Sequence, residues 1–295
     1  MREVSEDKRL KIVATLFPTY DFTRNIGRDT VEVSLLLPPG IESHSFEPRP
    51  GDIIRINSAD IFIFTNKYME TWIDDILKGI DNKDLLIVDS SNDIKFIEEK
   101  DGHDHKHDHK KEKNSRQITL DPHIWLDIRN AKKMVDNILA GLIKKDPLNR
   151  DFYINNAEVY KSKLDALDQE FYRGLSNCKK DIFVHAGHFA FGYLSERYKI
   201  RYISVYKGVS PDSEPTPAMM RNIINIIKKY GLTYIFYEEL MTPRLAEVIS
   251  KETGVGLLKL HAIHNLSKDE FEKGETFISL MQQNLKNLRI GLQCQ

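Results

Sequence analysis

Short runs of β-branched and aromatic residues alternate along this chain with longer amphipathic stretches. The runs lie at residues 11–16, 31–37, 61–65, 85–88, 182–185, 202–205, 234–237 and 256–260. Strands that alternate with helices are typical of α/β units on a mostly parallel sheet, and four strands are enough for one small domain. The pattern therefore predicts an α/β protein with two lobes, each a mostly parallel sheet flanked by helices.

A long helical stretch separates the two sets of strands. Between residues 149 and 177 the apolar side chains recur at spacings of three and four, which marks one face of an amphipathic helix. The residues of this face are Phe152, Tyr153, Ala157, Tyr160, Leu164, Leu167, Phe171 and Leu175. We expect one long, rigid connecting helix at 149–177, between an N-terminal lobe at 1–148 and a C-terminal lobe at 178–295.

The amino-acid composition argues against a nucleic-acid-binding protein and against a disulfide-rich one. The chain has 295 residues, of which 41% are hydrophobic, and its 43 Lys and Arg residues nearly cancel 44 Asp and Glu residues. A net charge of -1 gives no basic surplus for nucleic acid, so we expect no such partner. The only two cysteines, Cys178 and Cys294, are too few for a disulfide framework, and the sequence leaves open whether they pair.

One segment, residues 101–116, differs in kind from the rest. It begins DGHDHKHDHKKEK and has no apolar residue in that run to anchor a fold, which predicts a mobile His-rich loop. Alternating His with Asp and Lys is typical of loose, exchangeable metal capture, although a plain solvated linker is the alternative. The histidines concerned are His103, His105, His107 and His109.

Four histidines elsewhere follow predicted strands or lie in loops that open helices. They are His44, His123, His188 and His261. Any one of them alone is typical of a hydrogen-bonded loop histidine. Together they occupy the strand ends where open α/β sheets bind ligands, two from each lobe. Because four imidazoles complete a tetrahedral zinc shell, the placement indicates a metal site in a cleft between the lobes.

Several segments, in order along nearly the whole chain, resemble those of a known family. They are ATLFPTYDFTRNIG, IESHSFEPRPGDIIRINSADIFIF, LDPHIWLD, HFAFGYLSERYKI, VSPDSEPTP and YIFYEELMTPRLAEVISKETG. The chain is similar to the periplasmic or lipid-anchored metal-binding receptors of ABC importers for zinc and manganese, and the His-rich loop resembles that of the zinc-directed branch. This resemblance implies His44, His123 and His188 as metal ligands.

The fourth ligand departs from the family pattern, which offers an aspartate after the last strand or a glutamate after the preceding one. The matching positions here are His261 and Glu238, and His264 is a further candidate. We expect His261 to complete the shell, with Glu238 as the alternative fourth ligand or as a support for a histidine ring. An all-nitrogen shell favours Zn²⁺ over Mn²⁺.

The resemblance implies an extracytoplasmic metal-ion receptor, periplasmic or lipid-anchored, that is not an enzyme. We expect a monomer that captures Zn²⁺, or less readily Mn²⁺, and delivers it to an ABC transporter permease. The start MREVSEDKRLKIV has no apolar signal-peptide region, so we expect the native signal segment to be absent from this chain. The alternatives are a zinc-dependent hydrolase with Glu238 or Glu239 as general base, and an adhesion or interaction protein with an incidental metal site.

Overall fold

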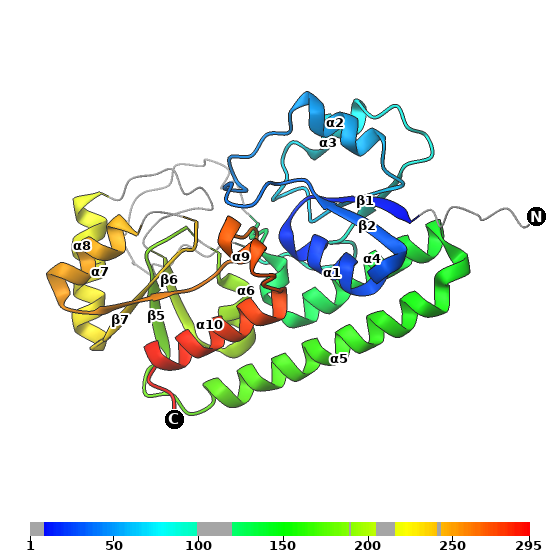
Figure 1. Ribbon diagram of the computed structural model, residues 1–295. Coiled ribbons are helices and arrows are strands. Elements are labelled where there is room, and N and C mark those ends of the chain that lie inside the picture. Colours follow the sequence, from blue (N-terminus) through cyan, green and yellow to red (C-terminus); the bar gives the residue numbers. More distant parts are fainter. Residues whose placement is uncertain (1–8, 99–119, 189, 205–215, 241–242) are drawn as a thin grey trace, which may run out of the picture. The chain divides into compact units, whose positions relative to one another are not determined.

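The computed structural model describes residues 9–98, 120–188, 190–204, 216–240 and 243–295. The chain divides into two compact units, and Figure 1 labels many of their helices and strands. Unit 1 comprises Met1–Ile94, Trp125–Glu170 and Ile263–Gln282, and unit 2 comprises Lys95–Ile124, Phe171–Ala262 and Gln283–Gln295. Each unit is therefore assembled from three separate stretches of chain.

Unit 1 is built on a parallel four-stranded sheet with the strand order β2-β1-β3-β4. Its strands are β1 (Leu10–Ala14), β2 (Val31–Leu35), β3 (Ile61–Phe64) and β4 (Leu86–Asp89). Its helices and 3-10 turns are α1 (Phe17–Gly27), η1 (Arg28–Thr30), α2 (Pro50–Asn57), α3 (Ile73–Lys78), α4 (Ile128–Lys145), η3 (Pro147–Asn149) and α9 (Lys268–Glu272). A further 3-10 turn, η2 (Ile124–Leu126), comes directly before α4.

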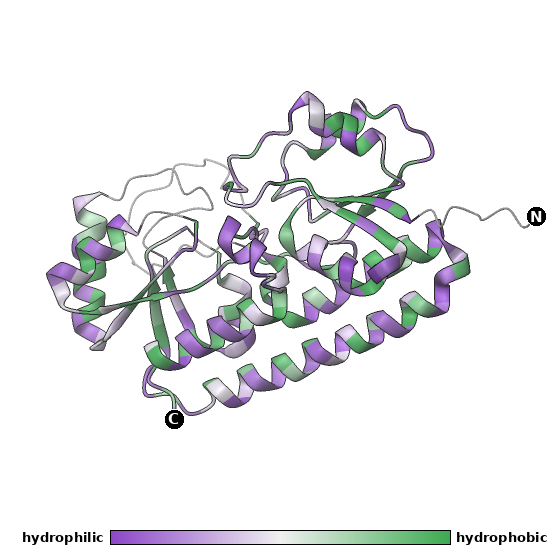
Figure 2. Ribbon diagram, in the orientation of Figure 1, coloured by the Kyte–Doolittle hydropathy of each residue, from purple (hydrophilic) through white to green (hydrophobic). Residues whose placement is uncertain are grey.

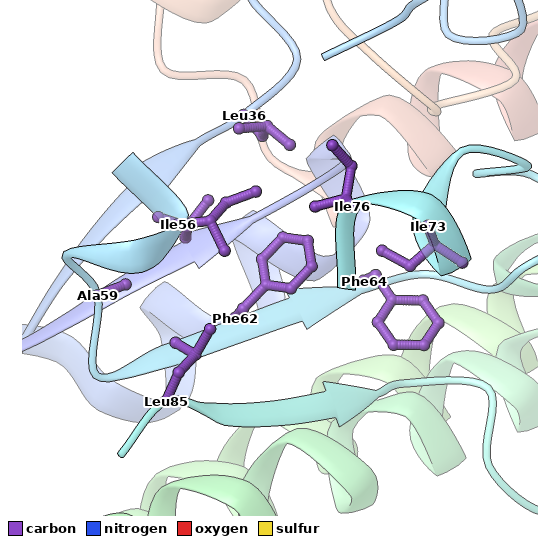
Figure 3. Packing of buried hydrophobic residues seen from close by; sticks show 9 residues of the cluster. Leu36, Ile56, Ala59, Phe62, Phe64, Ile73, Ile76 and Leu85 are labelled. Atoms are coloured by element: carbon purple, nitrogen blue, oxygen red, sulfur yellow. The ribbon is translucent and has the colours of Figure 1, made fainter. Parts of the chain in front are cut away.

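The core on one side of this sheet joins β3 to α2 and α3 (Figure 3). Phe62 and Phe64 are two residues apart on β3, so both side chains point to the same face of the sheet. They pack with Ile56 of α2 and with Ile73 and Ile76 of α3, all of them buried. This apolar contact explains why the two short helices lie against the strand.

Unit 2 repeats the arrangement with the strand order β6-β5-β7-β8, again parallel throughout. Its strands are β5 (Ile182–His185), β6 (Arg201–Ser204), β7 (Tyr234–Tyr237) and β8 (Gly256–Lys259). Its helices are α6 (Gly192–Tyr198), α7 (Pro217–Tyr230) and α8 (Arg244–Thr253). Ile223 and Ile227 of α7 and Ile249 of α8 pack against Ile182 and Ile235 of the sheet. The eight predicted strands are confirmed, to within two residues at each end.

The predicted long helix is confirmed as α5 (Arg150–Leu175), which has 26 residues. Hydrophobic and hydrophilic bands alternate along it in Figure 2, as its spacing predicts. Tyr153, Ala157 and Leu164 of the apolar face are buried, whereas Phe152 is 39% exposed and does not belong to that face. Helix α5 begins in unit 1 and ends in unit 2. The same is true of the last helix, α10 (Phe277–Gly291).

The two cysteines form a disulfide within unit 2, so the pairing that the sequence left open does occur. Cys178 follows α5 and Cys294 follows α10, and the two residues also form an isolated antiparallel bridge. The bridge therefore fastens the C-terminal end of the chain to the start of the second set of strands.

A buried carboxyl group, Asp21, joins three helices of unit 1. Asp21 lies on α1, and its Oδ2 accepts hydrogen bonds from the Tyr160 hydroxyl of α5 (2.8 Å) and the Phe277 amide of α10 (3.4 Å). Burial raises the pKa of Asp21 from 3.8 to about 6. The folded protein therefore holds the proton of Asp21 more tightly than the unfolded chain does.

Replacing Asp21 with asparagine should flatten the dependence of stability on pH. Because the folded-state pKa is raised, the contribution of Asp21 is fully present below pH 3.8 and is lost as the pH rises through about 6. This rise in pKa corresponds to about 3 kcal/mol of unfolding free energy. Urea unfolding at pH 4 and pH 7 measures the loss in wild type, in Asp21→Asn and in Asp29→Asn, an exposed control. Equal losses in all three proteins would refute the role of Asp21.

Candidate metal centre

His123 of unit 2 is held by a carboxylate two residues before it. Asp121 Oδ1 accepts a hydrogen bond from the His123 backbone amide (3.0 Å) and lies 2.8 Å from the ring Nδ1. Asp121 is itself anchored, because its amide donates to the Ile97 carbonyl and its carbonyl accepts from the Tyr193 hydroxyl. All of Asp121 and His123 is buried, so this ring has one fixed orientation.

Another histidine of unit 2, His188, lies against the carboxylate of Glu238. His188 follows β5 and Glu238 directly follows β7, and these two strands are parallel neighbours whose carboxyl ends lie side by side. Glu238 Oε1 lies 2.7 Å from His188 Nδ1, and Oε2 accepts from the His188 amide at 3.4 Å. Both side chains are completely buried.

The rings of His123 and His188 present their remaining nitrogens to each other. Their Nε2 atoms are 3.2 Å apart. A carboxylate at Nδ1 favours the tautomer that carries its proton there, which leaves the lone pair on Nε2 for a metal. Two Zn–N bonds of about 2.0–2.1 Å at a tetrahedral angle place their nitrogens about 3.3 Å apart. The pair therefore has the spacing that one zinc ion requires.

Two further histidines among the described residues of unit 2 lie outside this pair. His261 Nδ1 lies 3.2 Å from Glu239 Oε1, and Asn284 holds the His261 backbone at both its amide and its carbonyl. Among the described residues, His261 does not join His123 and His188 in a group of ligand atoms within 4.8 Å of one another. His185 ends β5 fully buried, and burial lowers its pKa from 6.5 to about 4, so it is neutral at pH 7.

Unit 1 has its own pair of histidines, His44 and His264. Their ring centroids are 5.9 Å apart. Glu42 contacts both residues, since its Oε1 accepts from the His44 amide (3.1 Å) and its Oε2 lies 3.5 Å from His264 Nε2. The Asn265 side chain donates to the carbonyls of Pro38 and Ile41, which ties the segment that carries His264 to the loop that carries His44.

The backbone beside His264 is strained. Ile263 has a φ of 64°, and a β-branched residue adopts this left-handed conformation only at a cost of about 1–3 kcal/mol. Such strain is typical of functional segments, where the surrounding contacts hold the chain in place. His264 is fully buried, and its carbonyl accepts from the Phe17 amide at 3.2 Å.

In the structure, carboxylates lie beside the histidines that were predicted as metal ligands. Glu42 and Asp121 were not among the predicted site residues. Glu238 was predicted as an alternative ligand, and Glu239 only as a general base in the hydrolase alternative. A signal for two of them is present in the sequence, because Glu42 and Asp121 each stand two residues before a predicted ligand. The histidines of the 101–116 loop, His103, His105, His107 and His109, lie outside the described residues.

Comparison with known proteins identifies the family. The family model described as zinc-uptake complex component A, periplasmic (ZnuA), matches residues 12–291. The chain is 34% identical over 289 residues to the high-affinity zinc uptake system protein ZnuA of Bacillus subtilis (strain 168), covering 98% of this chain and 89% of that protein. It is 35% identical over 283 residues to the zinc-binding lipoprotein AdcA of Streptococcus pneumoniae serotype 4 (strain TIGR4), covering 96% of this chain.

The chain spans only 56% of the length of that AdcA protein, which is therefore longer. A solved structure agrees with both relatives: the Zn(II)-bound ZnuA-like domain of Streptococcus pneumoniae AdcA matches with a TM-score of 0.81 and 33% identity, covering 97% of this chain and 99% of that domain. Within the described residues, no helix has the length and apolar character needed to cross a membrane. The family match over almost the whole chain, together with the fold and the paired histidines, shows that this chain belongs to the ZnuA family.

Proposed function

We propose that this chain is an extracytoplasmic receptor that captures Zn²⁺ and delivers it to an ABC permease. The observation that carries the proposal is the 3.2 Å separation of the His123 and His188 Nε2 atoms, each ring held by a buried carboxylate. The names of the relatives, zinc-binding and zinc-uptake proteins, support the same cargo. Imidazole nitrogens also favour Zn²⁺ over Mn²⁺, which prefers oxygen ligands.

The zinc ion would be shared by the two histidine pairs. In this proposal His123 and His188 of unit 2 supply two ligands, and His44 of unit 1 supplies the third. His264 is the fourth ligand that we favour, because its ring already lies beside that of His44. His261 remains the alternative, since a carboxylate also contacts its Nδ1.

Capture without chemical turnover fits this ligand set better than hydrolysis. Four protein ligands close a zinc shell, whereas a catalytic zinc keeps one position for water. A hydrolase would also need a carboxylate as general base beside that water. Glu238 and Glu239 are already engaged with the Nδ1 atoms of His188 and His261, which supports a receptor.

Zinc titration of wild type and of three single variants tests both the function and the fourth ligand. We expect one tightly bound Zn²⁺ per wild-type chain. His44→Ala and His264→Ala should weaken binding by about the same factor, because each removes one imidazole nitrogen from the shell. His261→Ala should weaken it much less. Competition with a chromophoric chelator gives the dissociation constants.

The outcomes separate the alternatives. A large loss in His261→Ala with a small loss in His264→Ala would return the fourth position to His261. X-ray absorption at the zinc edge that showed a bound water would favour the hydrolase. A wild-type chain that bound no zinc would refute the receptor.

A further inference from the structure

The chain between β5 and His188 passes through a space too small for any side chain. A Cβ atom at Gly187 would lie 2.4 Å from His185 Cε1 and 2.6 Å from Glu238 Oε2. Both distances are far below van der Waals contact. Any residue other than glycine at position 187 would therefore displace the His185 ring, the Glu238 carboxylate, or both.

The His185 ring, the other neighbour of a Cβ atom at Gly187, has little room to move. His185 is completely buried and packs edge-on against Phe191, with ring centroids 4.9 Å apart. It packs against Tyr202 as well, at 6.4 Å. Because close-packed rings do not yield easily, a methyl group at position 187 would act mainly on the carboxylate.

Glu238 makes the same two contacts with His188 that Asp121 makes with His123. In each case one carboxylate contacts both the ring Nδ1 and the backbone amide of a single histidine. Both oxygens of Glu238 thus lie close to His188, Oε1 to the ring Nδ1 and Oε2 to the amide. The repetition of this arrangement on the two histidines of one pair indicates one purpose, the orientation of Nε2.

We propose that Glu238 is a positioning residue for His188 and not a zinc ligand. The Glu238 carboxylate can lie beside His188 only because Gly187 has no side chain to displace it. The proposal rests on the zinc receptor function and goes beyond it, because it assigns Glu238 and gives Gly187 a role in binding. Removing a carboxylate that orients a zinc-bound histidine weakens metal affinity by about 10- to 100-fold.

Four variants test the assignment. Glu238→Ala removes the acceptor, and we expect a loss of about 10- to 100-fold in zinc affinity. Glu238→Gln should lose less, because its amide oxygen keeps an acceptor beside Nδ1. Gly187→Ala should lose about as much as Glu238→Ala, although it removes no polar group. The matched control is Gly51→Ala in α2, where an added Cβ meets nothing within 4 Å.

Two readouts distinguish positioning from ligation. The first is the visible spectrum of the chain saturated with Co²⁺, which reports the number of ligands. If Glu238 is a positioning residue, saturated Glu238→Ala should show the wild-type spectrum, but it should need a higher Co²⁺ concentration to reach saturation. The second is the Nδ1–H proton resonance of His188 in the metal-free protein, which should be protected in wild type and lost in Glu238→Ala and Gly187→Ala. This second readout holds even if the chain binds no zinc, so it separates this proposal from the receptor function.

A double variant closes the test. If Gly187 acts through Glu238, Gly187→Ala with Glu238→Ala should bind zinc no more weakly than Glu238→Ala alone. A changed Co²⁺ spectrum in saturated Glu238→Ala would show that Glu238 is a ligand and overturn the proposal. Wild-type affinity in Gly187→Ala would also overturn it. If Gly187→Ala does not fold, Glu238→Gln, which keeps the shape of the side chain, still decides the role of Glu238.

Discussion

Replacing His188 with alanine should weaken zinc binding by about 100- to 1000-fold, since a zinc binding energy of about 10–16 kcal/mol shared by four ligands gives about 3–4 kcal/mol to each. The variant removes one of the two Nε2 atoms that lie 3.2 Å apart. It also leaves Glu238 buried without the imidazole that it contacts. Isothermal titration or chelator competition gives the dissociation constant.

Leu194→Ala is the matched control for His188→Ala. Leu194 is fully buried on the helix that follows His188, and its truncation creates a cavity without removing a nitrogen. We expect this control to lower the thermal stability and to keep wild-type zinc affinity. If His188→Ala bound zinc as tightly as the control does, His188 would not belong to the site.

Breaking the Cys178–Cys294 disulfide should lower the free energy of unfolding by about 5 kcal/mol in the chain-entropy model. The bridge closes a loop with a sequence separation of 116 residues, and the constraint on the unfolded chain grows with the length of that loop. Cys294→Ser and Cys178→Ser should therefore be destabilised by the same amount. Urea unfolding without reductant measures the loss.

The double variant and the reduced protein supply the controls for the disulfide. Cys178→Ser with Cys294→Ser should be no less stable than either single variant, because one change already opens the loop. Wild type unfolded in the presence of dithiothreitol should match all three. A loss in only one of the single variants would mean that local packing, and not the bridge, carries the effect.

The strands and the long helix could be predicted because their patterns are local. Each strand is a short apolar run, and the face of α5 repeats at a spacing that only a helix satisfies. Phe152 was wrongly assigned to the buried face, because it fits the spacing but lies near the exposed start of the helix. A periodic pattern does not reveal where a helix leaves the core that it covers.

The histidines were easier to find from sequence than the groups that orient them. His44 and His123 follow a carboxylate by two residues, so those pairings are local and can be recognised in the chain. Glu238 meets His188 only because β5 and β7 are neighbours in the sheet, and the order of strands is not written in any short segment. The left-handed backbone at Ile263, between His261 and His264, could not be predicted either, because the sequence has no glycine there to mark it.

Because unit 1 is assembled from three separate stretches of chain, it cannot be completed early during synthesis. Its final part, Ile263–Gln282, is synthesised after almost all of unit 2, and it supplies His264, the Asn265 contacts and the Phe277 amide on Asp21. Contacts between such distant parts of a chain form late and slowly. A nascent chain that has just completed its first four strands therefore lacks the segment that finishes their unit, and folding of that unit must wait until residues 263–282 have been synthesised.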